Sequence, residues 1–309
     1  MRYHSLASAL GLVLGLLPHA AFSFPSAMNA ASDALREIQV LNFVLAFEHL
    51  GNAFYNNALS KYCQQTFIGA GLPPWARDRW SEMAEHQTTY VSFLRNILGD
   101  QAVPPCTYSF PDTDPWSFAD LSYLIETVAT SAYSGAVRNL LNPDLGPTLA
   151  AILAVKARHS AWINSAILDA NPWSTAFDTP LDMNHVLTLM SDFVVSCPSP
   201  PASSDLTDVL SPKPFRKLAL PPDSRPGQTV QLSFESADSN DPLFVWFATG
   251  FESTVLLMNT DKTVSIPSSI KGVIYVIVLD CNDTMSSAST VAGPAFLNID
   301  YDPHGQLTS

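Results

Sequence analysis

The sequence has little positive charge. It holds 15 Lys and Arg against 28 Asp and Glu among 309 residues, a net charge of −13. Nucleic acids and anionic membranes both select basic surfaces, so we expect neither as a partner. Charged residues make up only 14% of the chain, below the typical level of about 25%. Uncharged polar residues must therefore cover much of the surface, which fits a secreted protein.

Long apolar runs are missing beyond the N-terminus. The run Leu6–Leu17 is 12 residues long, whereas a membrane helix takes about 20. Arg2 precedes the run, and small residues suited to cleavage follow at Ala21-Phe22-Ser23. This order is typical of a secretory signal peptide. We therefore predict that residues 1–23 are a signal peptide and that the mature protein is secreted and soluble.

Cysteine is scarce. The four cysteines have spacings that match no zinc pattern, and they stand at Cys63, Cys106, Cys197 and Cys281. An even number in a secreted chain favours disulfides, and four cysteines allow three connectivities. We expect Cys63–Cys106 to tie a helix end to a long loop and Cys197–Cys281 to join two domains. Asn282 begins an Asn-Asp-Thr sequon and is a candidate glycosylation site.

Apolar residues recur at helical spacing through the first two thirds of the chain. Ser32 is a suitable N-cap for the first helix, Pro74 is well placed to open the second, and Gly99 to end it. The pattern predicts four long helices and a shorter fifth one at about residues 33–62, 75–98, 117–141, 147–170 and 181–195.

The connections between these helices predict their topology. Residues 142–146 form a short link, so the third and fourth helices should be antiparallel neighbours. The 18 residues of Gly99–Trp116 reach up to about 59 Å when extended, while a 24-residue helix is only about 36 Å long. This link is long enough to return along the whole bundle. Two hairpins joined by one crossover form the ferritin-like four-helix bundle, which we assign to residues 24–196.

The hydrophobic period changes to two after a stretch rich in Pro and Ser, residues 197–227, which we interpret as an interdomain linker. Several short alternating runs with Gly, Pro and Asn between them follow. They predict a small β-sandwich, immunoglobulin-like, over residues 228–309. The whole chain is thus expected to be an α+β multidomain protein.

Polar residues stand near the middle of each long helix: Glu48, Gln87 with Tyr90, Glu126, and Lys156 with His159. Ferritin-like di-metal bundles carry one Glu on each of two helices and Glu-x-x-His on each of the other two. The spacing here matches, but Gln87, Tyr90 and Lys156 stand where Glu, His and Glu would be ligands. Lys156 is the largest change, because it puts an ammonium group in place of an anionic ligand.

We interpret the six residues as a vestigial site: a buried cluster in which Lys156 pairs with Glu48 and Glu126 and the others complete the hydrogen bonds. No metal or other cofactor is then expected. Two alternatives keep an ion. Glu48, Glu126 and His159 could hold one if Lys156 swings away. Glu82 and His86, at i and i+4, could hold another, although a solvated acidic face explains those two as well.

Several stretches of the sequence match one known family: Phe47-Glu48-His49-Leu50, Ala84-Glu85-His86, Cys106-Thr107-Tyr108-Ser109-Phe110-Pro111, Ser131-Ala132-Tyr133-Ser134-Gly135-Ala136, Ala157-Arg158-His159 and Gly272-Val273-Ile274-Tyr275-Val276. In these stretches the chain resembles secreted ferritin-like proteins of fungi, related to stress-response and plant desiccation-related proteins. The resemblance covers most of the mature chain. Members of the family often show His-Glu-x-x-His in the second helix and Glu-Ala-Arg-His in the fourth. This chain has His86-Gln87-Thr88-Thr89-Tyr90 and Lys156-Ala157-Arg158-His159 instead, which argues against an inherited metal-dependent activity.

These observations favour a non-enzymatic secreted protein of stress or desiccation type, with a cell-wall or protein partner bound through the β-sandwich. The alternative is an iron- or manganese-dependent oxidase or peroxide-handling enzyme with an altered site. A hydrolase has little support, because no Gly-x-Ser-x-Gly elbow occurs in the sequence.

Overall fold

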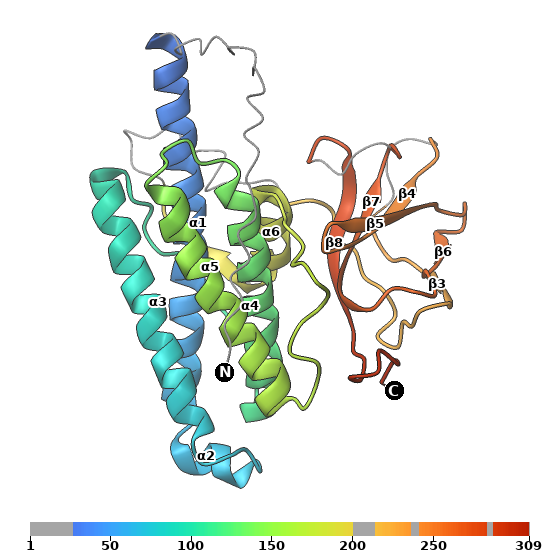
Figure 1. Cartoon of the computed structure of the whole chain (residues 1–309), viewed down its shortest axis with the longest axis horizontal. Coiled ribbons are helices and arrows are strands. Elements are labelled where there is room, and N and C mark those ends of the chain that lie inside the picture. The colour runs from blue at the N-terminus through green and yellow to red at the C-terminus, as the bar shows by residue number, and fades with distance from the viewer. Residues whose placement is uncertain (1–26, 200–213, 236–240, 283–286, 309) are drawn as a thin grey trace, which may run out of the picture.

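The computed structural model describes residues 27–199, 214–235, 241–282 and 287–308. The predicted signal peptide, residues 1–23, lies outside the described residues, as do residues 200–213 of the predicted linker. Figure 1 shows two parts, a group of long helices and a separate β-sheet region beside it. The predicted combination of a helical domain and a β domain in one chain is confirmed at this level.

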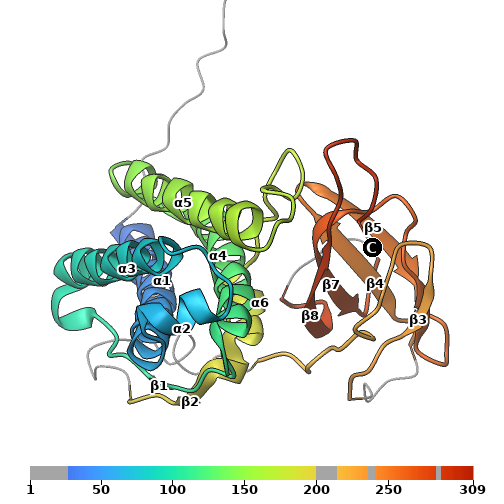
Figure 2. The ribbon, with the colours of Figure 1, turned by 90° about the horizontal axis from the view of Figure 1, so that it is seen from below.

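Among the described residues, the helical part contains four long helices. They lie side by side (Figure 2). A short helix, α2, follows the first, and another, α6, leads toward the β region. The elements are α1 (Ala27–Lys61), α2 (Gln64–Gly69), α3 (Ala76–Leu98), α4 (Pro115–Val137), α5 (Leu145–Trp162) and α6 (Met183–Met190). Helix α1 packs against α3, and α4 packs against α5.

Three helices differ from their predicted boundaries. Helix α4 starts at Pro115 rather than Ser117, because the side chain of Asp114 accepts hydrogen bonds from the backbone N–H groups of Trp116 and Ser117, while the backbone N–H of Asp114 donates to Ser117 Oγ. Helix α1 begins at Ala27, before the predicted cap at Ser32. Helix α5 changes to a π-helical turn, η2 (Ile163–Ile167), near its end.

The link from α3 to α4 runs along α1, as three hydrogen bonds show. Asn42 Nδ2 donates to the carbonyl of Gln101, and His49 Nε2 lies 3.2 Å from the carbonyl oxygen of Val103. Farther down α1, Tyr62 donates to the carboxylate of Asp112 at 2.9 Å. The three contacts follow both segments in the same order. The link therefore crosses from one end of the helices to the other.

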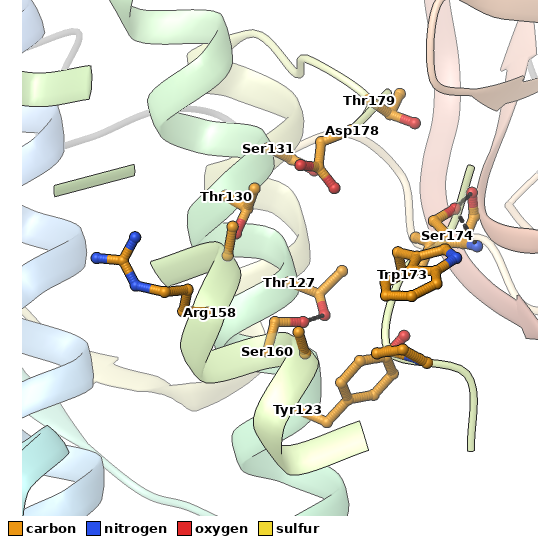
Figure 3. A pocket seen from close by; sticks show the side chains of 14 residues that line it. Tyr123, Thr127, Thr130, Ser131, Arg158, Ser160, Trp173, Ser174, Asp178 and Thr179 are labelled. Carbon is orange, nitrogen blue, oxygen red and sulfur yellow. Dashed lines mark hydrogen bonds between the residues drawn. The ribbon is translucent and has the colours of Figure 1, made fainter. Parts of the chain in front are cut away.

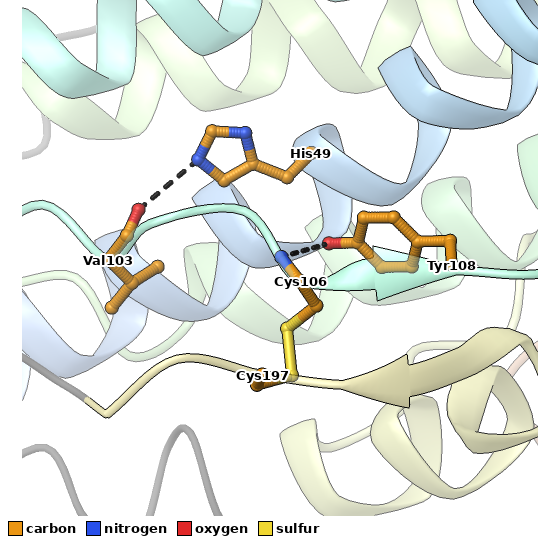
Figure 4. Close-up of a disulfide and its surroundings, with 5 residues drawn as sticks. All are labelled: His49, Val103, Cys106, Tyr108 and Cys197. Carbon is orange, nitrogen blue, oxygen red and sulfur yellow. Dashed lines mark hydrogen bonds between the residues drawn. A yellow bond between two sulfur atoms is a disulfide. The ribbon is translucent and has the colours of Figure 1, made fainter.

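The predicted disulfides Cys63–Cys106 and Cys197–Cys281 are wrong. The structure joins Cys106 to Cys197, with Cα atoms 4.2 Å apart (Figure 4). Cys106 precedes strand β1 (Thr107–Tyr108) and Cys197 follows strand β2 (Val194–Ser196), and these strands pair antiparallel with Thr107 opposite Ser196. The ladder sets the two cysteines side by side. Sequence patterns missed β2, because the fifth helix was predicted to continue to residue 195.

The β region is built on a four-stranded antiparallel sheet in the order β5-β4-β7-β8, beside a two-stranded ladder of β3 and β6. The strands are β3 (Thr229–Gln231), β4 (Phe244–Thr249), β5 (Glu252–Leu257), β6 (Thr263–Ser265), β7 (Gly272–Leu279) and β8 (Thr290–Ile299). A separate hydrophobic core forms here from residues of β3, β4, β6, β7 and β8. Leu218, within the predicted linker, is buried in this core.

Strand β7 connects the two parts of the molecule. All eight of its residues are buried, because one face meets the core of the β region and the other meets the helices. Tyr275 lies on the helical side, and its hydroxyl is 2.8 Å from Ser131 Oγ on α4. Ala248, Val273 and Tyr275 of the β region belong to the same hydrophobic core as the helices. The junction is therefore a packed interface.

Candidate functional site

The middles of the long helices converge on a buried cluster of polar side chains. Glu48 on α1, Gln87 on α3, Glu126 on α4 and Lys156 on α5 are each at most 1% exposed, and His159 on α5 is 8% exposed. Each helix presents its polar residue inward because its apolar neighbours occupy the same face. The structure thus brings together residues that are up to 111 positions apart in the chain.

Lys156 lies at the centre of the cluster. Its Nζ donates to Glu48 Oε2 at 2.9 Å and to Gln87 Oε1 at 2.6 Å. The ammonium also lies 5.3 Å from the centre of the Tyr90 ring, within the range of a cation–π contact. The ammonium thus has a carboxylate, an amide oxygen and an aromatic face around it. In the described part of the chain, no hydrogen bond joins it directly to Glu126.

Glu126 is held by three donors. Tyr55 donates to its Oε1 at 2.7 Å and Gln87 Nε2 donates to the same oxygen at 3.0 Å, while His159 Nδ1 lies 3.3 Å from Oε2. Gln87 thus joins the two halves of the cluster, because its amide oxygen accepts from Lys156 and its amide nitrogen donates to Glu126. An amide can do both at once, whereas a carboxylate can only accept.

The two carboxyl groups differ in their pKa values. Burial raises the pKa of Glu48, although Lys156 and the hydrogen bond from Tyr133 at 2.8 Å oppose this. Burial also acts to raise the pKa of Glu126, but the charges of Lys156 and His159 and the hydrogen bonds outweigh it and lower the pKa to about 2. Burial and the adjacent carboxylates raise the pKa of the Tyr55 and Tyr133 hydroxyls well above 10, so both stay protonated donors.

His86 connects the cluster to the surface. Its Nδ1 lies 3.0 Å from Nε2 of His159, and the two rings stack with an interplanar angle of 6°. His86 is exposed, and both histidines line an open hollow between α3 and α5. Burial and the charge of His159 lower the pKa of His86. A continuous path of polar contacts therefore runs from solvent through His86 and His159 to Glu126.

Gly51 on α1 makes room for this arrangement. A Cβ at this position would lie 3.2 Å from Cδ and Oε1 of Gln87, a contact tighter than ordinary van der Waals packing. Glycine inside a helix costs about 1 kcal/mol relative to alanine. The close approach of the Gln87 amide to the α1 backbone gives a physical reason for glycine here.

The predicted site residues and the observed cluster overlap but differ in their contacts. All six predicted residues lie in or against the cluster, Tyr90 through its ring. The expected Lys156–Glu126 bond is replaced by the bridge through Gln87. Tyr55 and Tyr133 were missed as members, since buried tyrosines are ordinary core residues in a sequence pattern. The carboxylate of Glu82 accepts two hydrogen bonds from Arg79, at 3.0 and 2.8 Å.

Comparison with known proteins agrees with the helical architecture. Residues 36–169 match the family model of the ferritin-like domain, and all six predicted site residues lie within this range. The chain is also similar to Protein rds1 of Schizosaccharomyces pombe (strain 972 / ATCC 24843), with 22% identity over 227 residues. That alignment covers 65% of this chain and 56% of the relative, so the chain spans little more than half the length of this curated protein. Residues 36–169 of the helical part are thus similar to a ferritin-like domain.

Within the residues that the structure describes, no group of three or more His, Cys, Asp or Glu side chains is arranged to hold a metal ion. In the same described ranges, no helix is long and apolar enough to cross a membrane.

Proposed function

We propose that this chain is a secreted ferritin-like protein of stress or desiccation type in which a buried ion pair has replaced the di-metal centre, so that the bundle is not catalytic. The observation that carries the proposal is the position of Lys156. Its ammonium is 1% exposed and bonds the carboxylate of Glu48 and the amide of Gln87. An ammonium in this place neutralises one carboxylate and occupies donor atoms that a metal would need.

The donor set does not fit two divalent ions. Two such ions carry a charge of about +4, which several carboxylates must balance in a buried site. Glu48 and Glu126 supply two negative charges, and Lys156 removes one of them. Gln87 is a neutral amide, and burial raises the pKa of the Tyr90 hydroxyl, which keeps it protonated. We therefore derive no reaction step through a metal.

Secretion and the domain division belong to the same proposal. The Cys106–Cys197 disulfide supports an oxidising compartment, in line with the signal peptide predicted for residues 1–23. We propose a bundle over residues 24–196, a linker over 197–227 and an immunoglobulin-like sandwich over 228–309. The two ladders of the β region around one core support the sandwich. Asn282 is exposed, as a glycosylated residue would need to be.

The second candidate function is a metal-dependent oxidase or peroxide-handling enzyme with an altered site. One observation favours it: His86 Nδ1 and His159 Nε2 face each other at 3.0 Å beside a surface hollow. Two imidazole nitrogens in this arrangement resemble a pair of adjacent metal ligands. Lys156 argues against it, since the positive charge lies close to Glu126 and hence to any ion that Glu126 would share.

Metal content separates the two functions. We expect protein secreted into medium replete in iron and manganese to contain far less than one metal per chain by elemental analysis, and to stay so after reconstitution. Near-stoichiometric metal that is lost in Glu48→Ala and in His159→Ala would overturn the proposal and favour the enzyme.

A triple variant tests the proposed ancestry of the site. Gln87→Glu, Tyr90→His and Lys156→Glu together restore the expected ligand set and should give tight binding of iron or manganese. The single variant Lys156→Met is the control, because it removes the ammonium without adding a ligand. A triple variant that folds but binds no more metal than the parent would show that these positions do not correspond to ligand positions.

A further inference from the structure

A second candidate site lies at the junction of the two parts of the molecule, away from the buried cluster. A cavity of about 260 Å³ opens between α4, α5, the segment 172–179 and the start of β7. Small-molecule sites typically have volumes of about 300–1,000 Å³, so this one suits a ligand of about one ring. Figure 3 shows the side chains that line it. Their chemistry indicates which ligand class it would accept.

Hydroxyl groups form one wall of the cavity. Thr127 Oγ1 on α4 and Ser160 Oγ on α5 lie 2.8 Å apart and face the space between the helices and the segment 172–179 (Figure 3). Tyr123 stands beside them on α4. A hydroxyl can donate one hydrogen bond and accept two, so one mutual bond leaves capacity for a ligand. A wall of this kind suits a ligand that carries many hydroxyl groups.

An exposed indole and a carboxylate form the other wall. Trp173 is 68% exposed although tryptophan is usually buried, and its ring borders the cavity. Asp178 lines the same cavity, and burial raises the pKa of its carboxyl group. Among the described residues, none forms a hydrogen bond or ion pair with this carboxylate. Asp178 is exposed, so its carboxylate oxygens are open to a ligand that donates hydrogen bonds.

The charged side chains around the cavity indicate that its ligand is not anionic. Arg158 borders the cavity, but Figure 3 shows its guanidinium directed away from it, on the other side of α5 from Asp178. Its charge also acts on Tyr90, which lies on α3. Asp178 is therefore the charged group that faces the ligand, and an anionic ligand would be repelled.

Trp173 also borders a second hollow. That hollow, of about 600 Å³, is lined by residues 169–173 and by the C-terminal segment with Asp300, Tyr301 and Thr308. Pro172 and Trp173 are common to both cavities. A ligand longer than one ring would thus lie across the indole, with one unit on each side of it.

The segment that carries these groups is fixed before any ligand binds. Ser174 Oγ accepts from the backbone of Val273 at 2.7 Å, and Thr179 Oγ1 accepts from the backbone of Gly250 at 2.6 Å. Tyr301 donates to the carbonyl of Ser174 at 2.7 Å. These bonds pin both ends of the segment to the β region. Because the segment is already ordered, ligand binding costs less conformational entropy.

We propose that the cavity at the junction and the adjoining hollow bind a neutral oligosaccharide. One sugar ring would stack on Trp173, and its hydroxyl groups would bond to Asp178, Thr127 and Ser160. A sugar ring has an apolar face of C–H groups that packs on an indole, and a rim of hydroxyls that both donate and accept. The proposal rests on the cell-wall partner expected from the sequence, and it places that partner at the junction rather than on the β region alone. It does not depend on the metal state of the bundle.

The test uses isothermal titration of the full secreted chain with cellohexaose, laminarihexaose, chitohexaose and mannohexaose. We expect at least one to bind, with quenching or a shift of tryptophan fluorescence. Trp173→Ala and Asp178→Asn should each weaken that binding about tenfold or more. Phe251→Ala is the matched control, since Phe251 is 72% exposed and does not line either cavity.

Three results would overturn the proposal. One is that no neutral oligosaccharide binds at millimolar concentration. Another is that Trp173→Ala, shown to be folded by its unchanged thermal transition, binds as the parent does. The third is that tetramethylammonium or spermidine binds while the sugars do not, which would identify a cation site formed by the aromatic rings and Asp178. An anionic oligogalacturonate should bind more weakly than the neutral sugars.

Discussion

Replacement of Lys156 by methionine tests the energetics of the buried cluster most directly. Lys156→Met keeps an unbranched side chain but removes the ammonium, so the carboxylate of Glu48 loses a donor at 2.9 Å and the amide oxygen of Gln87 loses one at 2.6 Å. Both partners are 0% exposed, so water cannot replace the lost donor without a rearrangement. Loss of one partner from a buried ion pair costs on the order of 3–5 kcal/mol. We expect a loss of free energy of unfolding in that range at pH 7.

The loss should depend on pH in a defined direction. Burial already raises the pKa of Glu48 above its ordinary value of 4.5, and removal of the ammonium raises it further. The folded variant then keeps a proton that the unfolded chain has released. The stabilising effect of that proton is fully present below the unfolded pKa and is lost as the pH rises through the folded pKa. The variant should therefore be closer to the parent in stability at pH 5 than at pH 8.

Urea denaturation followed by circular dichroism at both pH values measures these differences. Arg79→Met is the matched control, because the Arg79–Glu82 pair has side chains that are 58% and 54% exposed and such a surface pair contributes less than about 1 kcal/mol. Glu48→Gln combined with Lys156→Met should cost less than the sum of the two single changes, by about 2 kcal/mol. A loss below about 1 kcal/mol for Lys156→Met, equal at both pH values, would refute the reasoning.

Two further predictions concern Gly51 and the disulfide. Gly51→Ala should destabilise the protein by about 1–3 kcal/mol in urea denaturation, because the added Cβ meets Gln87 at 3.2 Å. Gly146→Ala on α5 is the control and should be neutral or stabilising, because its added Cβ has nothing within 4 Å. Equal effects of the two changes would contradict the close approach of Gln87 to Gly51. Cys106→Ala with Cys197→Ala opens a loop of 91 residues and should lower the free energy of unfolding by about 4–5 kcal/mol on loop entropy alone. Peptide mapping without reduction should show this pair in the parent, and a different linkage would contradict the structure.

Some of the fold follows from local chemistry and so was predictable. The helical spacing of apolar residues in α3, the glycine that ends it at Gly99 and the length of the following link all depend on residues close together in sequence. So do the runs of alternating or continuous apolar residues that form β4 and β7. The positions of the polar site residues were predicted for the same reason. The length of each helix fixes which residues lie at its middle, and the middles of neighbouring helices lie at the same height in the bundle.

Other features depend on contacts between distant segments. Residues 194–196 form a strand only because β1, 86 or more positions away, offers a partner. That pairing decides the disulfide between Cys106 and Cys197, which spacing alone could not select among three connectivities. A short segment has too few residues for its own preference to outweigh such tertiary contacts.

The sequence by itself determined which chemical groups the bundle would enclose: two carboxylates, an amide, an ammonium and an imidazole on four helices. Only the tertiary structure decided how they pair. Gln87 bridges Lys156 and Glu126, and two tyrosine hydroxyls donate hydrogen bonds to the carboxylates. Trp173 lies at the junction of the helices and the β region. Residue type and helical period are local properties of the chain. Hydrogen-bond partners and cavities arise where separate elements meet, and their geometry is set by packing across the whole molecule.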